Sequence, residues 1–113
     1  RSEGVLVQAG VVLTCDATIG EFVTLNVGCT IAHDCRLAAF ATVSPGAHIG
    51  GNVTIEEGGF VGIGASVVQG VRIGAWSVVG AGAVVVRDVP PNSVVTGVPA
   101  TARAIRPEGW QHG

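Results

Sequence analysis

Three residues in the first half of the chain have the types and the spacing for proton-transfer chemistry. His33 is followed directly by Asp34, and Gly51 lies eighteen residues after His33. The pKa of a histidine lies close to neutral pH, so its imidazole can accept a proton from an attacking amine or hydroxyl. The same residues also fit ordinary turns, in which the histidine and the carboxylate are solvated and the glycine only forms a corner.

The elements that would position these residues repeat every six positions. From Val7 to Val85, every sixth residue is Val, Ile or Leu. A second series begins two residues earlier, runs from Val5 to Ala83, and contains only small residues or Val. Glycine often follows the aliphatic position, at Gly20, Gly50, Gly62, Gly74 and Gly80, and Asn26 takes the same place.

A helix does not produce this pattern, because positions six apart on an α-helix differ by roughly 240° around its axis. Six residues instead make one short strand and one tight turn, with both apolar series facing inward. We expect Gly and Asn after the aliphatic residue to supply the positive φ of each corner. Three sides then close an eighteen-residue coil, and residues 1–86 form a triangular all-β prism of between four and five coils.

Composition agrees with a narrow core. The chain has 113 residues and a mass of 11.3 kDa, enough for one domain, with 48% hydrophobic but only 4% aromatic residues. The high hydrophobic fraction and the low net charge of -2 argue against disorder. Only 12% of the residues are charged and the pI is about 5.8, which argues against nucleic-acid binding. No run is apolar enough for membrane insertion. Three cysteines without paired spacing suit a reducing compartment, so we expect a cytoplasmic protein. The early start of the repeat suggests a piece of a longer chain.

Aromatic residues and the end of the chain add two expectations. Phe22, Phe40 and Trp76 are spaced by multiples of eighteen, so they should form one outer column, either as packing between coils or as a subunit interface. Residues 87–113 form a separate C-terminal part. It holds a turn at 87–92, a short strand near 94–97, a brief helix or extended tail over 100–105, and a frayed end over 107–113.

The hexads resemble the left-handed parallel β-helix of hexapeptide-repeat acyltransferases. The more specific resemblance is to sugar acetyltransferases of the sialic-acid O-acetyltransferase and bacillosamine-type N-acetyltransferase group. The stretches that carry it are Ile31-Ala32-His33-Asp34-Cys35, Ser44-Pro45-Gly46-Ala47, Gly51-Asn52-Val53-Thr54-Ile55, Val79-Gly80-Ala81-Gly82-Ala83-Val84-Val85 and Gly97-Val98-Pro99-Ala100. Complete members of that group carry a nucleotide-binding domain before the β-helix, and this chain matches only the C-terminal β-helix part.

The resemblance implies an acetyl-CoA-dependent transferase that acetylates an amino or hydroxyl group of a sugar or nucleotide-sugar. It implies that His33 is the general base, that Asp34 orients it, and that the Gly51 N–H stabilises the oxyanion. Acetyl-CoA would lie between two subunits of a homotrimer, and the matching coenzyme positions are Gly51, Ile63, Ala81, Gly97 and Pro99. One departure is Thr42, which stands where some relatives have a second histidine.

Two other readings stay open. The chain could be a non-catalytic trimerisation module that lacks its sugar-binding domain. A γ-type carbonic anhydrase needs three histidine ligands, whereas the repeat contains only His33 and His48, so we expect no metal site. We expect His48 to be structural, and Cys29 and Cys35 to fill the core.

Overall fold

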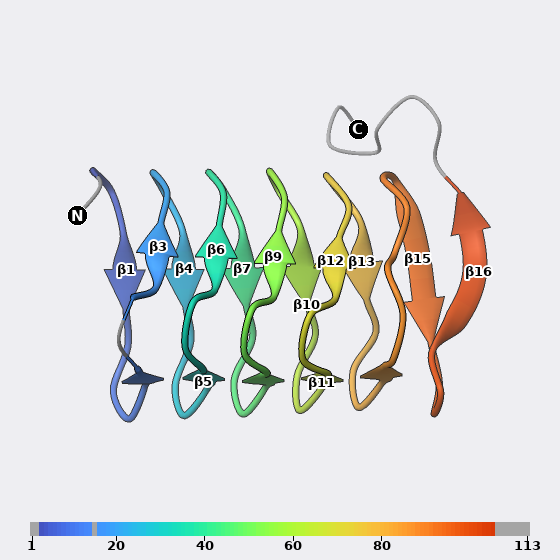
Figure 1. The fold of residues 1–113 in the computed structure, drawn as a ribbon, viewed down its shortest axis with the longest axis horizontal. Helices are drawn as coiled ribbons and strands as arrows, with labels where there is room; N and C mark the ends of the chain where they lie inside the picture. The colour runs from blue at the N-terminus through green and yellow to red at the C-terminus, as the bar shows by residue number, and fades with distance from the viewer. Residues whose placement is uncertain (1–2, 15, 106–113) are drawn as a thin grey trace.

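The chain forms a left-handed parallel β-helix of about five turns, with no helix in the part that the structure describes (Figure 1). The structure is a computed structural model and describes residues 3–14 and 16–105. The predicted fold class is confirmed. Within the described residues, no helix is long and apolar enough to cross a membrane.

Short strands recur along the described chain with the six-residue period that the sequence predicted. The first fourteen contain two residues each: β1 (Leu6–Val7), β2 (Val12–Leu13), β3 (Thr18–Ile19), β4 (Thr24–Leu25), β5 (Thr30–Ile31), β6 (Arg36–Leu37), β7 (Thr42–Val43), β8 (His48–Ile49), β9 (Thr54–Ile55), β10 (Phe60–Val61), β11 (Ser66–Val67), β12 (Arg72–Ile73), β13 (Val78–Val79) and β14 (Val84–Val85). β15 (Ser93–Thr96) and β16 (Thr101–Ile105) follow.

Every third strand joins the same sheet, which gives the prism its three faces. One face holds β1-β4-β7-β10-β13-β15-β16, the second β14-β11-β8-β5-β2 and the third β12-β9-β6-β3. Partners in the regular coils are parallel and eighteen residues apart; Ile31, for example, lies opposite Ile49. Residues eighteen apart therefore lie on neighbouring coils at the same place on the prism.

The core is the stack of the two inward series. Most of their members from Val23 to Val85 are buried, including Leu37, Ile55 and Ile73. At the N-terminal end of the stack, Val7 and Leu13 stay 45% and 42% exposed. The inward direction of both series is as predicted, because neighbouring residues of a strand point to opposite faces.

The predicted role of the repeat glycines was wrong. Gly20, Gly50, Gly62, Gly74 and Gly80 do not have positive φ; the left-handed residues come two positions later, as at Gly46, Gly64 and Gly82. The glycines after the aliphatic position instead let the coils approach. A Cβ on Gly62 would lie 2.7 Å from the Val79 oxygen and 2.8 Å from the Ala81 nitrogen.

The last turn is two residues shorter than the others. Val78 pairs with Val94 and Ile73 with Val89, sixteen residues apart instead of eighteen. Asp88, in the predicted turn at 87–92, accepts a hydrogen bond from the Arg72 N–H at 2.9 Å. The predicted short strand is β15, and residues 101–105 form the antiparallel strand β16. The extended alternative is therefore right and the helix wrong, and 107–113 lie outside the described residues.

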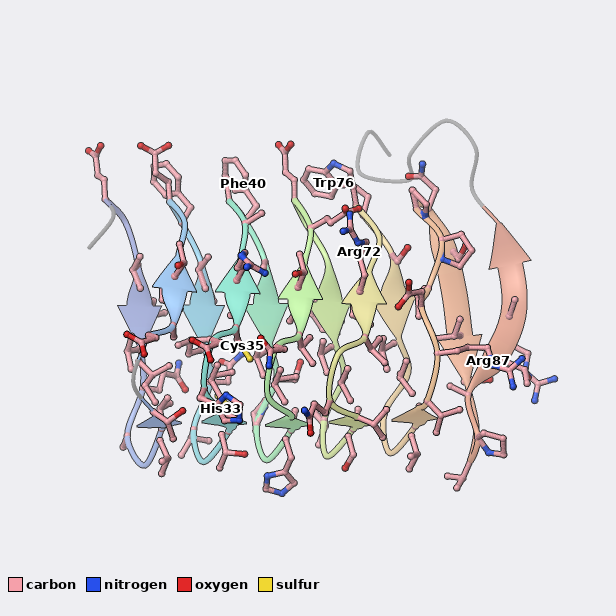
Figure 2. All side chains as sticks on the ribbon, viewed as in Figure 1. His33, Cys35, Phe40, Arg72, Trp76 and Arg87 are labelled. Atoms are coloured by element: carbon pink, nitrogen blue, oxygen red, sulfur yellow. The ribbon has the colours of Figure 1, made fainter. Side chains whose placement is uncertain are left out.

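The aromatic residues form the predicted column. Phe22 and Phe40 stack with ring centroids 5.3 Å apart, and Phe40 and Trp76 with centroids 6.5 Å apart. Trp76 reaches Phe40 across the coil between them because the Trp76 ring covers Gly58. Figure 2 shows Phe40 and Trp76 along the same edge of the prism. The ring contacts thus join coils that are one turn apart (Phe22 and Phe40) and two turns apart (Phe40 and Trp76). A subunit interface at this column stays a prediction.

Candidate functional site

His33 lies at the corner between β5 and β6, where the chain leaves one face of the prism for the next. Ile31 of β5 and Cys35 point into the core, so the turn between them carries His33 and Asp34 at the surface. Asp34 adopts the left-handed conformation with φ 59°. Aspartate tolerates this region better than most residues because its short polar side chain can bond locally.

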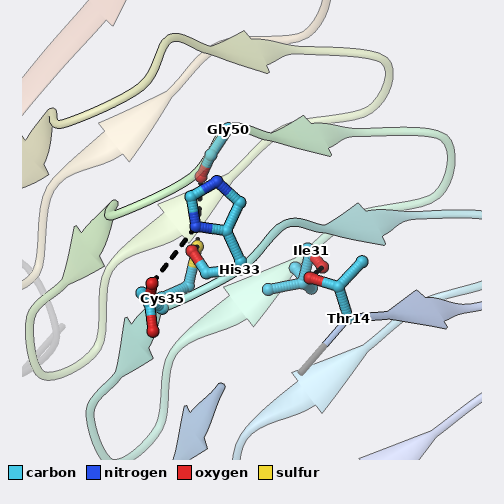
Figure 3. A network of polar contacts seen from close by, with 6 residues as sticks. Thr14, Ile31, His33, Cys35 and Gly50 are labelled. Carbon is cyan, nitrogen blue, oxygen red and sulfur yellow. Dashed lines mark hydrogen bonds and ion pairs between the residues drawn. The ribbon is translucent and has the colours of Figure 1, made fainter. Parts of the chain in front are cut away.

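Hydrogen bonding to Asp34 determines which imidazole nitrogen of His33 is available. Nδ1 lies 3.2 Å from Asp34 Oδ2, and the two side chains are 57% and 51% exposed (Figure 3). An ionised carboxylate only accepts hydrogen bonds, so Nδ1 carries the proton in this pair when the ring is neutral. Nε2 then holds the free lone pair, which is the arrangement of a general base.

Gly51 lies one coil further at the same corner, as its spacing predicted. The Asn52 N–H donates to the His33 carbonyl at 2.9 Å, which joins the two coils at this point. The His33 ring covers Gly51: a Cβ there would lie 2.6 Å from Nε2 and 2.7 Å from Cε1. Among the described residues, no backbone hydrogen bond is donated by the Gly51 N–H. The His33 imidazole and the Gly51 N–H thus lie side by side, and both can contact a ligand.

Cys35 supports this corner from inside the prism. Its Sγ donates to the Gly50 carbonyl at 3.1 Å, so the thiol connects the His33 turn to the residue before Gly51 (Figure 3). Burial, more than any other cause, raises the pKa of the Cys35 thiol, and burial likewise raises that of Cys29. Both are free, buried and protonated at neutral pH, which agrees with core filling rather than nucleophilic chemistry. The hydrogen bond to Gly50 was not predicted.

The predicted coenzyme residues Ile63 and Ala81 lie together, but at a different corner from His33. They follow β10 and β13 and line one open apolar groove of about 330 Å³. Ser44, Pro45 and Phe60 are among the other residues that line it. Like Gly51, neither residue donates a backbone hydrogen bond among those of the described chain.

Gly97 and Pro99 lie outside that groove. The Gly97 carbonyl accepts a hydrogen bond from the Val84 N–H at 3.0 Å, which attaches the segment after β15 to β14. Pro99 lines a separate hollow at the C-terminal end of the prism, together with Arg87 and Val95. Within one chain, the predicted site residues therefore form three groups rather than one.

The remaining polar candidates lie on the flat faces. His48 Nδ1 is 2.9 Å from Thr30 Oγ1 on the neighbouring strand, so its ring is held against the sheet. Thr42 lies on β7, opposite Thr24 and Phe60, on a face that does not include His33. No group of three or more potential metal ligands occurs among the described residues.

Solved structures supply the comparison. No protein-family profile and no curated protein matches the chain. WeeI from Acinetobacter baumannii is 34% identical, with a TM-score of 0.86, over 91% of this chain and 52% of its own. The acetyltransferase domain of PglB from Neisseria gonorrhoeae is 32% identical, with a TM-score of 0.74, over 88% of this chain and 57% of its own.

A third similar structure contains two ligands. It is a histidine-to-alanine variant of GDP-perosamine N-acetyltransferase from Caulobacter crescentus with CoA and GDP-perosamine; it is 33% identical, with a TM-score of 0.62, over 89% of this chain and 54% of its own. The chain thus spans about half the length of these structures. The chain has the left-handed β-helix fold of hexapeptide repeats, and it is similar to the β-helix part of these acetyltransferases.

Proposed function

We propose that the chain is the acetyl-transferring β-helix of an acetyl-CoA-dependent sugar acetyltransferase. The observation that carries the proposal is the His33 corner, where the Asp34 contact leaves Nε2 free beside the Gly51 amide. The similar PglB domain has been solved with acetyl coenzyme A, and the similar perosamine enzyme with CoA and GDP-perosamine. The acceptor is the amino or hydroxyl group of a sugar or nucleotide-sugar.

The reaction needs one base and one oxyanion donor. His33 Nε2 removes the proton from the acceptor nitrogen or oxygen as that atom attacks the thioester carbonyl. The Gly51 N–H donates to the oxygen that becomes negative. The C–S bond then breaks as the new C–N or C–O bond is completed, and the proton on Nε2 passes to the departing thiolate of the coenzyme.

The coenzyme arm would lie along the Ile63 and Ala81 groove. Ligand amides can pair with the outward N–H groups of these residues, while the apolar wall covers the methylene groups. A complete site then needs this groove beside a His33 corner. Because the two lie at different corners of one prism, we propose a homotrimer in which one subunit supplies the corner and its neighbour supplies the groove.

Calorimetric titration with acetyl-CoA, followed by an acceptor screen with amino-sugars and sugars, tests this function. We expect one micromolar site per chain, and the screen decides between N- and O-acetylation. His33→Ala should lower kcat by roughly 10²–10⁴-fold with the fold intact, because a positioned general base contributes about that much. His48→Ala is the matched control and should keep its activity. Unchanged turnover in His33→Ala would remove this residue from the mechanism.

One alternative is a non-catalytic trimerisation module, because the His33 corner and the groove at Ile63 and Ala81 lie apart within one chain. It predicts a trimer by sedimentation that shows no heat of binding with acetyl-CoA. We also propose a reducing, cytoplasmic location, because Cys29 and Cys35 are free and buried in the core.

A further inference from the structure

We propose that Gly51 positions the His33 imidazole because it has no side chain. The His33 ring fills the space that a Cβ on Gly51 would occupy, and we call this space the seat. Gly51 thus has two roles: it leaves room for the base, and it offers its N–H to the oxyanion. This inference rests on the proposed function for its effect on turnover. Its structural part, the seat itself, does not depend on what the enzyme acetylates.

The contact distances identify the seat. A Cβ built on Gly51 would meet three atoms of one side chain: His33 Nε2 at 2.6 Å, Cε1 at 2.7 Å and Cδ2 at 3.2 Å. Real Cβ contacts are essentially never shorter than 3.0 Å, so the ring and a side chain at position 51 exclude each other. Nε2, the proposed proton acceptor, is the nearest of these atoms. Any side chain at position 51 therefore displaces the reacting nitrogen itself.

The residues at equivalent corners of the repeat show that the backbone at position 51 does not require glycine. Gly51 lies two residues after the inward aliphatic Ile49, and the fourteen equivalent positions from Ala9 to Arg87 contain one glycine, Gly51. Ala39, Ala75 and Ala81 occupy the same place at other corners. Gly51 does not have positive φ, so alanine fits its backbone without strain. The exception occurs one coil after His33, where the ring needs the space.

The two roles of Gly51, leaving space for the His33 ring and donating its N–H, can be tested separately. Gly51→Ala keeps the N–H and the backbone conformation, so an enzyme that used only the amide would be unaffected. The ring, however, would have to rotate away. His33 is more than half exposed, so this rotation costs the fold little, but it removes Nδ1 from Asp34 and Nε2 from the acceptor.

NMR of the full chain tests the seat directly. In the wild-type protein we expect a nuclear Overhauser contact between His33 Hε1 and the Gly51 α-protons, and ¹⁵N shifts of a neutral ring protonated at Nδ1. In Gly51→Ala we expect that tautomer preference to be lost, while the urea midpoint stays within experimental error. Gln69→Ala, at the same corner two coils from His33, is the control and should leave the ring signals unchanged. Absence of the contact in the wild-type protein, or an unchanged tautomer in Gly51→Ala, overturns the proposal.

Kinetics then connect the seat to turnover. We expect Gly51→Ala to lower kcat by at least 10-fold and to keep the Kd for acetyl-CoA within 2-fold. Combining it with His33→Ala should add no further loss, because the two changes remove the same group from the site. A fall in kcat with unchanged ring signals would assign the effect to something other than the seat and also overturn the proposal. If the wild-type protein has no transferase activity, the NMR result still decides whether Gly51 seats the ring.

Discussion

Ile55→Ala tests whether each coil depends on one fully packed layer of side chains. Ile55 lies on β9 with no exposed surface, and it pairs in register with Leu37 on one side and Ile73 on the other. Both neighbours belong to the same inward column. A hole at Ile55 is therefore bounded by coils whose spacing is fixed by backbone hydrogen bonds, and it cannot close easily.

The cost follows from the atoms removed. Isoleucine to alanine deletes three carbon groups, and at about 0.8 kcal/mol for each buried carbon the transfer loss is about 2.4 kcal/mol. A residual cavity of roughly 75 Å³ adds about 1.8 kcal/mol at about 24 cal/mol per Å³. We therefore expect the free energy of unfolding to fall by about 4 kcal/mol, within the usual range of about 2–5 kcal/mol for such a change.

Urea unfolding followed by circular dichroism, at several protein concentrations, measures this loss. The concentration series separates the intrinsic stability of the chain from that of an assembly. Thr54→Ala is the matched control on the same strand, since Thr54 points to the outer face and should cost less than about 1 kcal/mol. The reasoning is refuted if Ile55→Ala costs no more than Thr54→Ala, because the inward column would then not be the main source of stability.

Two further changes test the thiols and the aromatic column. Burial holds the pKa of the Cys29 and Cys35 thiols above the ordinary 9.0. The stability from their neutral form is therefore complete below pH 9 and is lost as pH rises through the folded-state pKa, as a lower urea midpoint at pH 10.5 than at pH 8 would show. Phe40→Ala removes two ring contacts and Phe22→Ala one. At about 0.5–1.5 kcal/mol for each contact beyond buried area, Phe40→Ala should give the lower melting temperature, and equal values would contradict the column.

The sequence was sufficient to predict the coil because the period determines where every side chain points. Alternation along a strand sets Ile55 inward and Thr54 outward, and a spacing of eighteen sets Phe22 beside Phe40. The corner conformations were not predictable in the same way. Glycine is favoured both where φ is positive and where neighbouring coils approach closely. The sequence alone does not tell which of these two causes applies to a given glycine. Gly62 allows the close approach of the next coil. Phe40, in contrast, adopts a positive φ of 64° although it is not a glycine.

The site was predictable in part for the same reason. His33 and Gly51 differ by eighteen, so their contact followed from the coil. Ile63 lies thirty residues after His33, which is not a multiple of eighteen, and this spacing already placed it at another corner. Pro99 was beyond such reasoning because the turn before it is sixteen residues long, and a register counted in eighteens does not hold past Val85.

The proposed chemistry lies at the corners, where the described backbone leaves N–H donors unused. Along the strands, each coil hydrogen-bonds to the next, and the ladder occupies the N–H groups. In the described part of the chain, the N–H of the residue two places after each inward aliphatic residue donates no backbone hydrogen bond. His33, Gly51, Ile63 and Ala81 all occupy that place. Amides that point outward can bind a thioester oxygen or a ligand amide without breaking the fold. The residue at that place then determines what each corner does: His33 supplies an imidazole, Gly51 leaves the space that this imidazole fills, and Ile63 and Ala81 form an apolar wall.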